Sequence, residues 1–212
     1  MRWLPYHAGV SFFFYKQASE IVPDMEEVAR YVGYSRLQVP DEAVSRMMRE
    51  ACEAMHPLLS PRCVYDRYPL MMEGCRICFA DVDISSKDLS RNLSGCSELV
   101  LFAATIGSPV DSLIRRTQAR DKALAAVMQA AGAMFIESFV DDFNRMVKEE
   151  AAAAGRRTHP RYSPGYGDVP LSVQKHFFSL LQCYKINLTL MDTLIMAPEK
   201  SVTAFIGLEE LG

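Results

Sequence analysis

The chain has 212 residues, of which half are apolar, and a formal net charge of −3. This length suits one domain, and the apolar content allows a sizeable core without disulfides or a structural metal. Proteins that bind nucleic acid or anionic membranes usually carry a basic surplus, so the charge argues against both classes.

No stretch of the chain has the pattern of a targeting or membrane segment. The apolar run SFFFY at 11–15 is too short for a secretory signal and lacks a cleavage-type flank. The longest apolar stretch, 123–136, falls short of the roughly 20 residues of a membrane span and runs into Glu137. We therefore expect a cytoplasmic protein without membrane contact, whose six cysteines are free thiols.

The first third of the chain predicts helices. Residues 23–33 begin with a Pro-Asp pair and end at Gly33, which suits a helix C-cap. Residues 40–59 begin after a proline, and their apolar positions recur at helical spacing. These two segments indicate a helical N-terminal part over residues 1–60.

The middle of the chain predicts strands. Residues 62–70 and 75–84 alternate between apolar and polar positions and are rich in β-formers, which favours a hairpin with its turn at 73–75. Residues 87–95 read as a short helix that ends at Gly95. The apolar run 97–107 has the length of a strand and predicts a central one.

A long helix is predicted to follow. Ser108 suits the N-cap, Pro109 the first helical position, and Asp111 the third, where its carboxylate can accept from free amides. The helix is expected to reach about residue 150, with a kink near Asp121 or around Gly132.

Beyond the long helix, residues 171–184 predict an amphipathic helix and 200–208 a closing strand. Helices and strands mix without strict βαβ alternation, so the expected fold class is α+β, with a mixed or antiparallel twisted sheet flanked by helices. We expect one domain over 1–212, in which residues 61–212 hold the sheet, the long helix and a candidate binding loop.

Metal and phosphate motifs are weak in this sequence. Cys75 and Cys78 form a single CxxC within a predicted strand, without a second pair or a histidine pair at zinc-ligand spacing. The turn 104–111 could offer helix amides to an anion, but its lone glycine is far from a phosphate-loop signature. We assign no metal ligand and no catalytic residue.

The loop RYSPGYGD at 161–168 combines a cation, a tight corner and a ring. Arg161 presents a fork suited to a carboxylate, Gly165 lets main chain approach a ligand, and Tyr166 offers a flat face. With an acid such as Glu137, Arg161 could hold both ends of an amino acid. Two ordinary readings remain open: Arg161 paired with an acid of the fold, and Glu137 solvated beside Asp141.

Three segments in order resemble the activation, or S-adenosylmethionine-binding, domain of vitamin B12-dependent methionine synthase. Residues 161–181 resemble its R-x-x-x-G-Y segment, 135–147 its glutamate-bearing long helix, and 196–202 its M-x-P-x-x-S-V segment. The strand and turn at 101–111 are also similar, so the resemblance covers about the C-terminal half.

The resemblance implies binding of S-adenosylmethionine. By position, Arg161 would hold the carboxylate of S-adenosylmethionine and Glu137 would contact its polar end. The main chain around Asp168 would bind the adenosine part. Tyr166 would face the corrin. The domain would support reductive methylation of cob(II)alamin to methylcobalamin on a partner, a methionine synthase without its own activation domain, with an electron from flavodoxin or a similar donor. The chain would be a methyltransferase component in methionine biosynthesis and not a self-sufficient enzyme.

The chain departs from the family in three ways. The family has alanine at the position of Asp168. The family also has a further acidic residue near the start of the domain, and no residue of this chain aligns with it, although Tyr31, Tyr34 and Asp41 lie in that part. The cobalamin-binding D-x-H-x-x-G motif is absent, so the resemblance implies a stand-alone reactivation subunit. One alternative is a binding or scaffold protein for another corrinoid system. The other is a self-contained methyltransferase, but that class needs a glycine-rich turn after its first strand, and this sequence has none.

Overall fold

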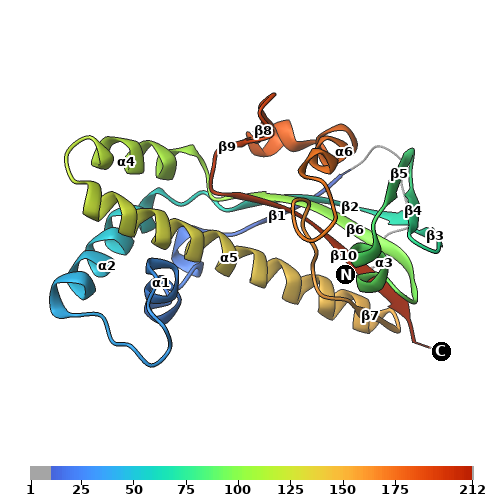
Figure 1. Cartoon of the computed structure of the whole chain (residues 1–212), viewed down its shortest axis with the longest axis horizontal. Helices are drawn as coiled ribbons and strands as arrows, with labels where there is room; N and C mark the ends of the chain where they lie inside the picture. The colour runs from blue at the N-terminus through green and yellow to red at the C-terminus, as the bar shows by residue number, and fades with distance from the viewer. Residues whose placement is uncertain (1–10, 212) are drawn as a thin grey trace.

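The computed structural model describes residues 11–211, which form an α+β fold around an antiparallel twisted sheet (Figure 1). The five strands of this sheet are, in spatial order, β1 (Phe12–Tyr15), β2 (Arg62–Pro69), β6 (Cys96–Thr105), β10 (Ser201–Glu210) and β7 (Arg156–Thr158). All four pairings are antiparallel. The predicted fold class, with its sheet flanked by helices and one long helix, is confirmed.

The central strand is β6, as the apolar run predicted. It pairs with β2 on one side and with β10 on the other, and residues 99–105 are buried throughout. A strand that is covered on both faces needs continuous apolar residues rather than alternation, which explains the sequence pattern.

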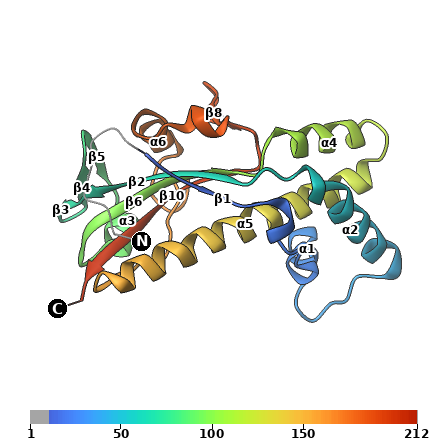
Figure 2. The same cartoon turned by 180° about the vertical axis from the view of Figure 1, so that it is seen from behind.

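One long helix covers one face of the sheet, and three further helices pack against that helix (Figures 1 and 2). The long helix is α5 (Lys122–Ala153), and the three that pack against it are α1 (Met25–Val32), α2 (Glu42–Met55) and α4 (Ser108–Gln118). Short 3₁₀ turns lie at Ala18–Glu20 and His56–Leu58. α5 runs the length of the sheet and buries Phe135, Phe139 and Phe143 against it. This face holds the larger of the two cores.

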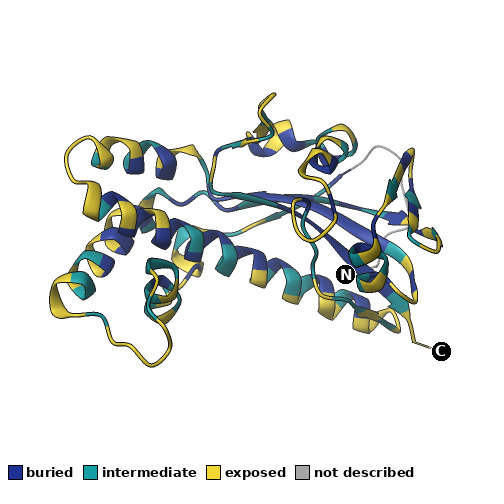
Figure 3. Ribbon diagram, viewed as in Figure 1, coloured by how far each residue is buried: buried dark blue, intermediate teal, exposed yellow. Residues whose placement is uncertain are grey.

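The opposite face carries a second core, centred on Phe79, Phe177 and Phe205. The elements that cover it are β3 (Met71–Glu73), β4 (Arg76–Phe79), β5 (Val82–Ser85), α3 (Lys87–Asn92), α6 (Gln174–Leu180), β8 (Thr189–Leu190) and β9 (Met196–Ala197), with 3₁₀ turns at Leu171–Val173 and Cys183–Ile186. Figure 3 shows the buried residues concentrated along the sheet and the inner side of α5, with exposed residues in the connecting loops.

The predicted hairpin between 62–70 and 75–84 is wrong in its pairing. β2 pairs with β1 and β6, whereas β4 pairs with β3 and β5 in a separate small sheet. Pro69 is the last residue of β2, the Leu70 N–H still donates to the Ser97 carbonyl at 2.9 Å, and the chain then turns back at Gly74. Residues 12–15 of the run SFFFY, which carried no structural prediction, form the edge strand β1, so residues 1–60 are not entirely helical.

The long helix is broken at one of the two predicted kinks. α4 ends at Gln118, and Asp121 caps α5 by accepting from the Leu124 N–H at 2.9 Å, whereas Gly132 lies inside an unbroken helix. The predicted N-cap of α4 is off by one residue, because Gly107 takes this position and Ser108 is already helical.

α5 is the one helix within residues 11–211 that is long and apolar enough to cross a membrane by length and composition. Of its most apolar 18-residue window, 61% is buried inside the fold. Its apolar side chains are therefore used in packing against the sheet.

Candidate functional site

The loop that contains residues 161–168 is attached to the free edge of β10. The Tyr162 N–H donates to the Phe205 carbonyl at 2.9 Å, and the Phe205 N–H donates to the Tyr162 carbonyl at 2.8 Å. Because side chains alternate along this short bridge, neighbouring residues reach opposite faces of the sheet. Arg161 extends toward α5, while Tyr162 packs against the second core.

The loop closes on itself in a compact turn. The Gly165 N–H donates to the Val169 carbonyl at 2.9 Å, and the Val169 N–H donates to the Tyr166 carbonyl at 3.0 Å. Gly165 has a φ of +90°, and a Cβ there would lie 3.2 Å from the side chain of Leu171. Tyr166, the next residue, is 69% exposed.

Arg161 bridges two carboxylates one turn apart on α5. Its Nη1 donates to Asp141 at 2.9 Å, and its Nη2 donates to Glu137. Glu137 is partly covered, whereas Asp141 is 63% exposed in its side chain. The structure thus brings together Arg161 and Glu137, two predicted site residues 24 positions apart, and adds Asp141 as a second partner.

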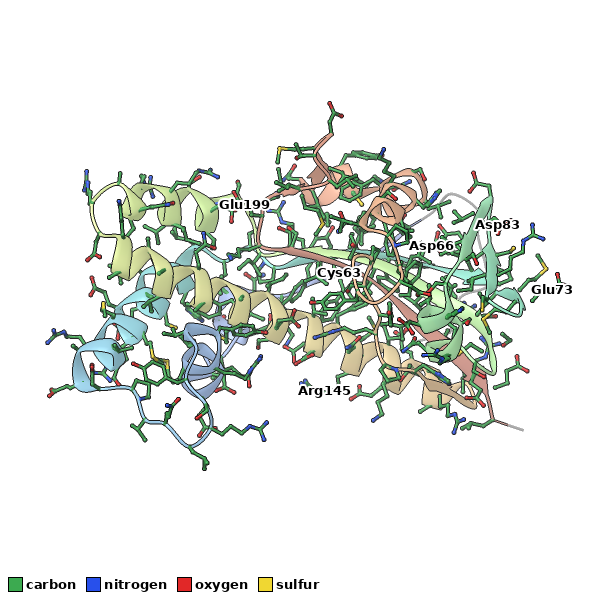
Figure 4. All side chains as sticks on the ribbon, in the orientation of Figure 1. Cys63, Asp66, Glu73, Asp83, Arg145 and Glu199 are labelled. Carbon is green, nitrogen blue, oxygen red and sulfur yellow. The ribbon has the colours of Figure 1, made fainter. Side chains whose placement is uncertain are left out.

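An acidic depression of about 220 Å³ lies beside this ion pair, between α1 and α5. Its lining residues are Asp24, Glu27, Tyr31, Met134, Glu137, Ser138, Asp141, Asp142 and Arg145. Arg145 projects from the side of α5 away from the sheet in Figure 4. A fork-shaped cation next to several carboxylates suits a small ligand that carries both a carboxylate and a positive charge.

α1 contributes an ordered wall to this depression. The Asp24 carboxylate caps the helix by accepting from the N–H groups of Glu26 and Glu27, and Glu27 pairs with Arg30 at 2.6 Å. The Arg30 guanidinium lies 4.2 Å above the Tyr31 ring. Burial, followed by the nearby Glu137 carboxylate, raises the pKa of Tyr31, so its phenol stays protonated and can donate a hydrogen bond.

The N-terminal wall is the part of the site that the sequence analysis left unassigned. Of the three residues considered there, Tyr31 lines the depression, Asp41 caps α2 at Val44, and Tyr34 lines a separate hollow between α1 and α2. Asp24 and Glu27 were missed. Their spacing with Tyr31, three and four residues apart, places all three on one side of a helix and is the signal that could have found them.

Asp168 lies at the other end of the loop and contacts α3 rather than α5. Its carboxylate accepts from the Ser86 hydroxyl and from the N–H groups of Lys87, at 2.7 Å, and Asp88, at 3.2 Å. The side chain is therefore engaged within the protein, and only the main chain around Asp168 stays available for the contact that was predicted.

The remaining candidates have structural partners. Asp111 does not accept from the amides of its own helix: its carboxylate accepts from the Glu199 N–H at 2.6 Å, which joins α4 to the segment before β10. The Ile106 N–H donates to the Lys200 carbonyl, so the segments 101–111 and 196–202 lie side by side. All six cysteines carry free thiols, and residues 11–211 contain no group of His, Cys, Asp or Glu able to hold a metal ion.

Comparisons with known proteins bear on the fold of this chain. No protein-family model matches it. Methionine synthase of Mycobacterium leprae is 24% identical over 159 residues, which cover 66% of this chain and only 13% of that protein. The crystal structure of the MetH reactivation domain bound to AdoHcy matches with a TM-score of 0.69 at 16% identity, covering 95% of this chain and 79% of that one. The chain and the reactivation domain share a fold.

Proposed function

We propose that this chain binds S-adenosylmethionine between α5 and the 161–168 loop and acts in the reactivation of a cobalamin-dependent methionine synthase. One observation carries the proposal. Arg161 meets Glu137 across the loop and α5 in a fold shared with a reactivation domain bound to AdoHcy, which is S-adenosylhomocysteine. The donor set fits the ligand, because its methionine part carries a carboxylate, an ammonium and a sulfonium.

Each predicted site residue has a defined role in this proposal. Arg161 holds the ligand carboxylate, which replaces the more exposed of its two partners, Asp141. Glu137 binds the positively charged end of the ligand. Gly165 lets the loop main chain come close, and the main chain at Asp168 binds the adenosine.

The acidic wall of α1 supports the same assignment. Asp24 and Glu27 face the depression that Glu137 lines, and their negative charge favours a cationic ligand there. Tyr31 adds a protonated phenol that can donate to the ligand carboxylate. Asp24 and Glu27 are the candidates for the acidic contact near the start of the domain.

The methyl acceptor in this proposal is the cobalamin of a partner methionine synthase that lacks an activation domain. Once an electron from flavodoxin or a similar donor has reduced it, its cobalt supplies the nucleophile. The residues of this chain bind the ligand, orient its methyl group and exclude water. Tyr166 and Leu171, both exposed, offer the apolar surface that would face the corrin.

Isothermal calorimetry tests the ligand assignment. We expect the unsubstituted chain to bind S-adenosylmethionine and S-adenosylhomocysteine, and Arg161→Ala to weaken both by roughly ten- to a hundredfold, since a charged hydrogen bond to a carboxylate is lost. Arg116→Ala, at an exposed position on α4, is the matched control and should bind like the unsubstituted chain. An Arg161→Ala variant with unchanged affinity contradicts the assignment.

A reconstitution tests the role in reactivation. The chain is mixed with a cob(II)alamin-loaded methionine synthase that lacks its activation domain, S-adenosylmethionine and an electron source, and the cobalamin spectrum is followed. Methylation that depends on Arg161 supports the proposal. Ligand binding without methylation favours the alternative, a binding or scaffold protein for another corrinoid methyltransferase.

A further inference from the structure

The short helix α3 holds the 161–168 loop from the side opposite α5. α3 lies over the second core, where its residue Leu89 is fully buried. The chain reaches α3 from β5 and enters β6 beyond it, so the helix is fixed to the central sheet at its C-terminal side. Hydrogen bonds join both ends of α3 to the loop region.

The first contact is at the N-terminus of α3. Amides in the first turn of a helix have no partner within the helix. Here the Asp168 carboxylate accepts from the amides of Lys87 and Asp88 and from the Ser86 hydroxyl. Ser86 Oγ also accepts from the Leu89 N–H at 3.0 Å, so one buried hydroxyl joins the cap of α3 to the loop.

The second contact is at the C-terminal end of α3, where Asn92 meets the residues that enter the loop. Its side-chain amide donates to the Pro160 carbonyl at 3.0 Å, and its main-chain carbonyl lies 2.6 Å from Nδ1 of His159. The stretch from His159 to Asp168 is therefore bracketed by the two ends of one helix.

The turn between these contacts fits closely against α3. Gly167 has a φ of +53°, and a Cβ at this position would lie 2.4 Å from both the Asp88 carboxylate and the Tyr162 hydroxyl. The Tyr162 hydroxyl in turn donates to the Tyr166 carbonyl at 3.2 Å. Asp168 therefore holds a turn that contacts the protein on two sides and leaves no room for a side chain at 167.

We propose that Asp168 is a positioning residue, whose side chain fixes the 161–168 loop on α3 and so presets Gly165 and Tyr166 for the ligand. The benefit to ligand binding rests on the proposed function, whereas the attachment to α3 does not. A loop that is already ordered in the free protein loses less conformational entropy when a ligand binds, which strengthens binding without a new contact.

The charge state of Asp168 supports this role. Hydrogen bonds from Ser86 and from the first amides of α3 hold the pKa of Asp168 below its usual range. A carboxyl whose pKa is lowered in the folded state stabilises the fold above its unfolded pKa, about 4, and this contribution is lost as the pH falls through the lowered value. The attachment is therefore complete at neutral pH.

The test compares Asp168→Ala and Asp168→Asn with Asp192→Ala, which alters an exposed aspartate in the β8–β9 turn. Hydrogen exchange of the ligand-free proteins is followed in peptides that cover residues 163–170, and affinity for S-adenosylhomocysteine is measured by calorimetry. We expect Asp168→Ala to speed exchange by about tenfold or more and to weaken binding by roughly three- to tenfold. Asp168→Asn keeps an acceptor oxygen and should restore part of both, while Asp192→Ala should change neither.

Two results overturn the proposal: unchanged exchange and affinity in Asp168→Ala, or an Asn variant as impaired as the Ala variant. If Asp168→Ala does not fold, the Asn variant and the control carry the same comparison. If the unsubstituted chain does not bind S-adenosylhomocysteine, the proposed function and the benefit to binding both fail. The exchange data still decide whether Asp168 fixes the loop.

Discussion

The two halves of the candidate site are held in place by different forces. α5 presents Glu137 from a helix whose inner side is packed into the main core through Phe135, Phe139 and Phe143. The 161–168 loop presents Arg161 and is held by main-chain pairing to β10 and polar contacts to α3. Apolar packing holds the α5 half, whereas the loop half combines hydrogen bonds with the packing of Tyr162 against the second core. Stability and ligand binding should therefore respond to different substitutions.

The largest effect is expected in the packed half. Phe139→Ala removes a fully buried ring that contacts Phe14 across the core, and should lower the free energy of unfolding by about 3–5 kcal/mol. Tyr184→Ala, at a tyrosine that is 68% exposed, is the control and should stay within about 0.5 kcal/mol of the unsubstituted chain. Denaturant unfolding measures both, and a loss below about 1 kcal/mol for Phe139→Ala would contradict this account of α5.

A smaller effect, on binding rather than stability, is expected where the halves meet. Glu137→Gln keeps the shape of the side chain but removes the charge that faces the ligand cation, so affinity for S-adenosylmethionine should fall by roughly tenfold. Glu149→Gln, exposed on the same helix, should bind normally. Calorimetry decides, and the prediction fails if both variants bind equally well.

The smallest effect is expected at Glu209, which binds Arg157 and His159 just before the 161–168 loop and forms a polar anchor there. Hydrogen bonds from Arg157 and then from His159 hold the pKa of Glu209 below its usual range. A lowered pKa means that this carboxylate stabilises the fold above pH about 4.3 and ceases to do so as the pH falls through the lowered value. Glu209→Gln should therefore melt below the unsubstituted chain at pH 7, and the difference should shrink toward pH 3.

Thermal melts across this pH range measure the effect of Glu209→Gln. Glu73→Gln alters an exposed glutamate on the edge strand β3 and is the control without such a pH dependence. A melting difference for Glu209→Gln that stays constant from pH 7 to pH 3 would show that the anchor is not electrostatic. Phe139→Ala should show no such pH dependence, because a phenylalanine side chain does not titrate.

Local patterns in the sequence predicted the parts of the fold that depend on local chemistry. The apolar run of β6, the glycine that ends α1 and the aspartate that interrupts the long helix were all readable, because burial, a φ of +114° at Gly33 and a capping carboxylate at Asp121 act over a few residues. Pairing partners were not readable. The apolar alternation of 62–70 fits β1 and β6 as well as it fits the neighbouring segment, and only the folded core selects between them.

The candidate site was predicted in the same partial way. Residue chemistry and family resemblance linked Arg161 and Glu137 as holding the two ends of a ligand. In the structure Arg161 pairs directly with Glu137 and Asp141, which is the ordinary reading that the sequence left open. The carboxylates of α1 were missed because they approach α5 only through packing of the two helices. The side chain of Asp168 was also beyond prediction, since the helix that it caps lies 80 residues earlier in the chain.

Hydrogen exchange with and without S-adenosylhomocysteine tests the central claim most directly. If α5 and the 161–168 loop form one ligand site, bound ligand should slow exchange in peptides covering 134–142 and 161–169, and also at the α1 wall, residues 24–31. Peptides from α2 and from the β8–β9 turn should exchange as before. Binding that leaves the loop and α5 unprotected, or protects only other regions, would contradict the claim.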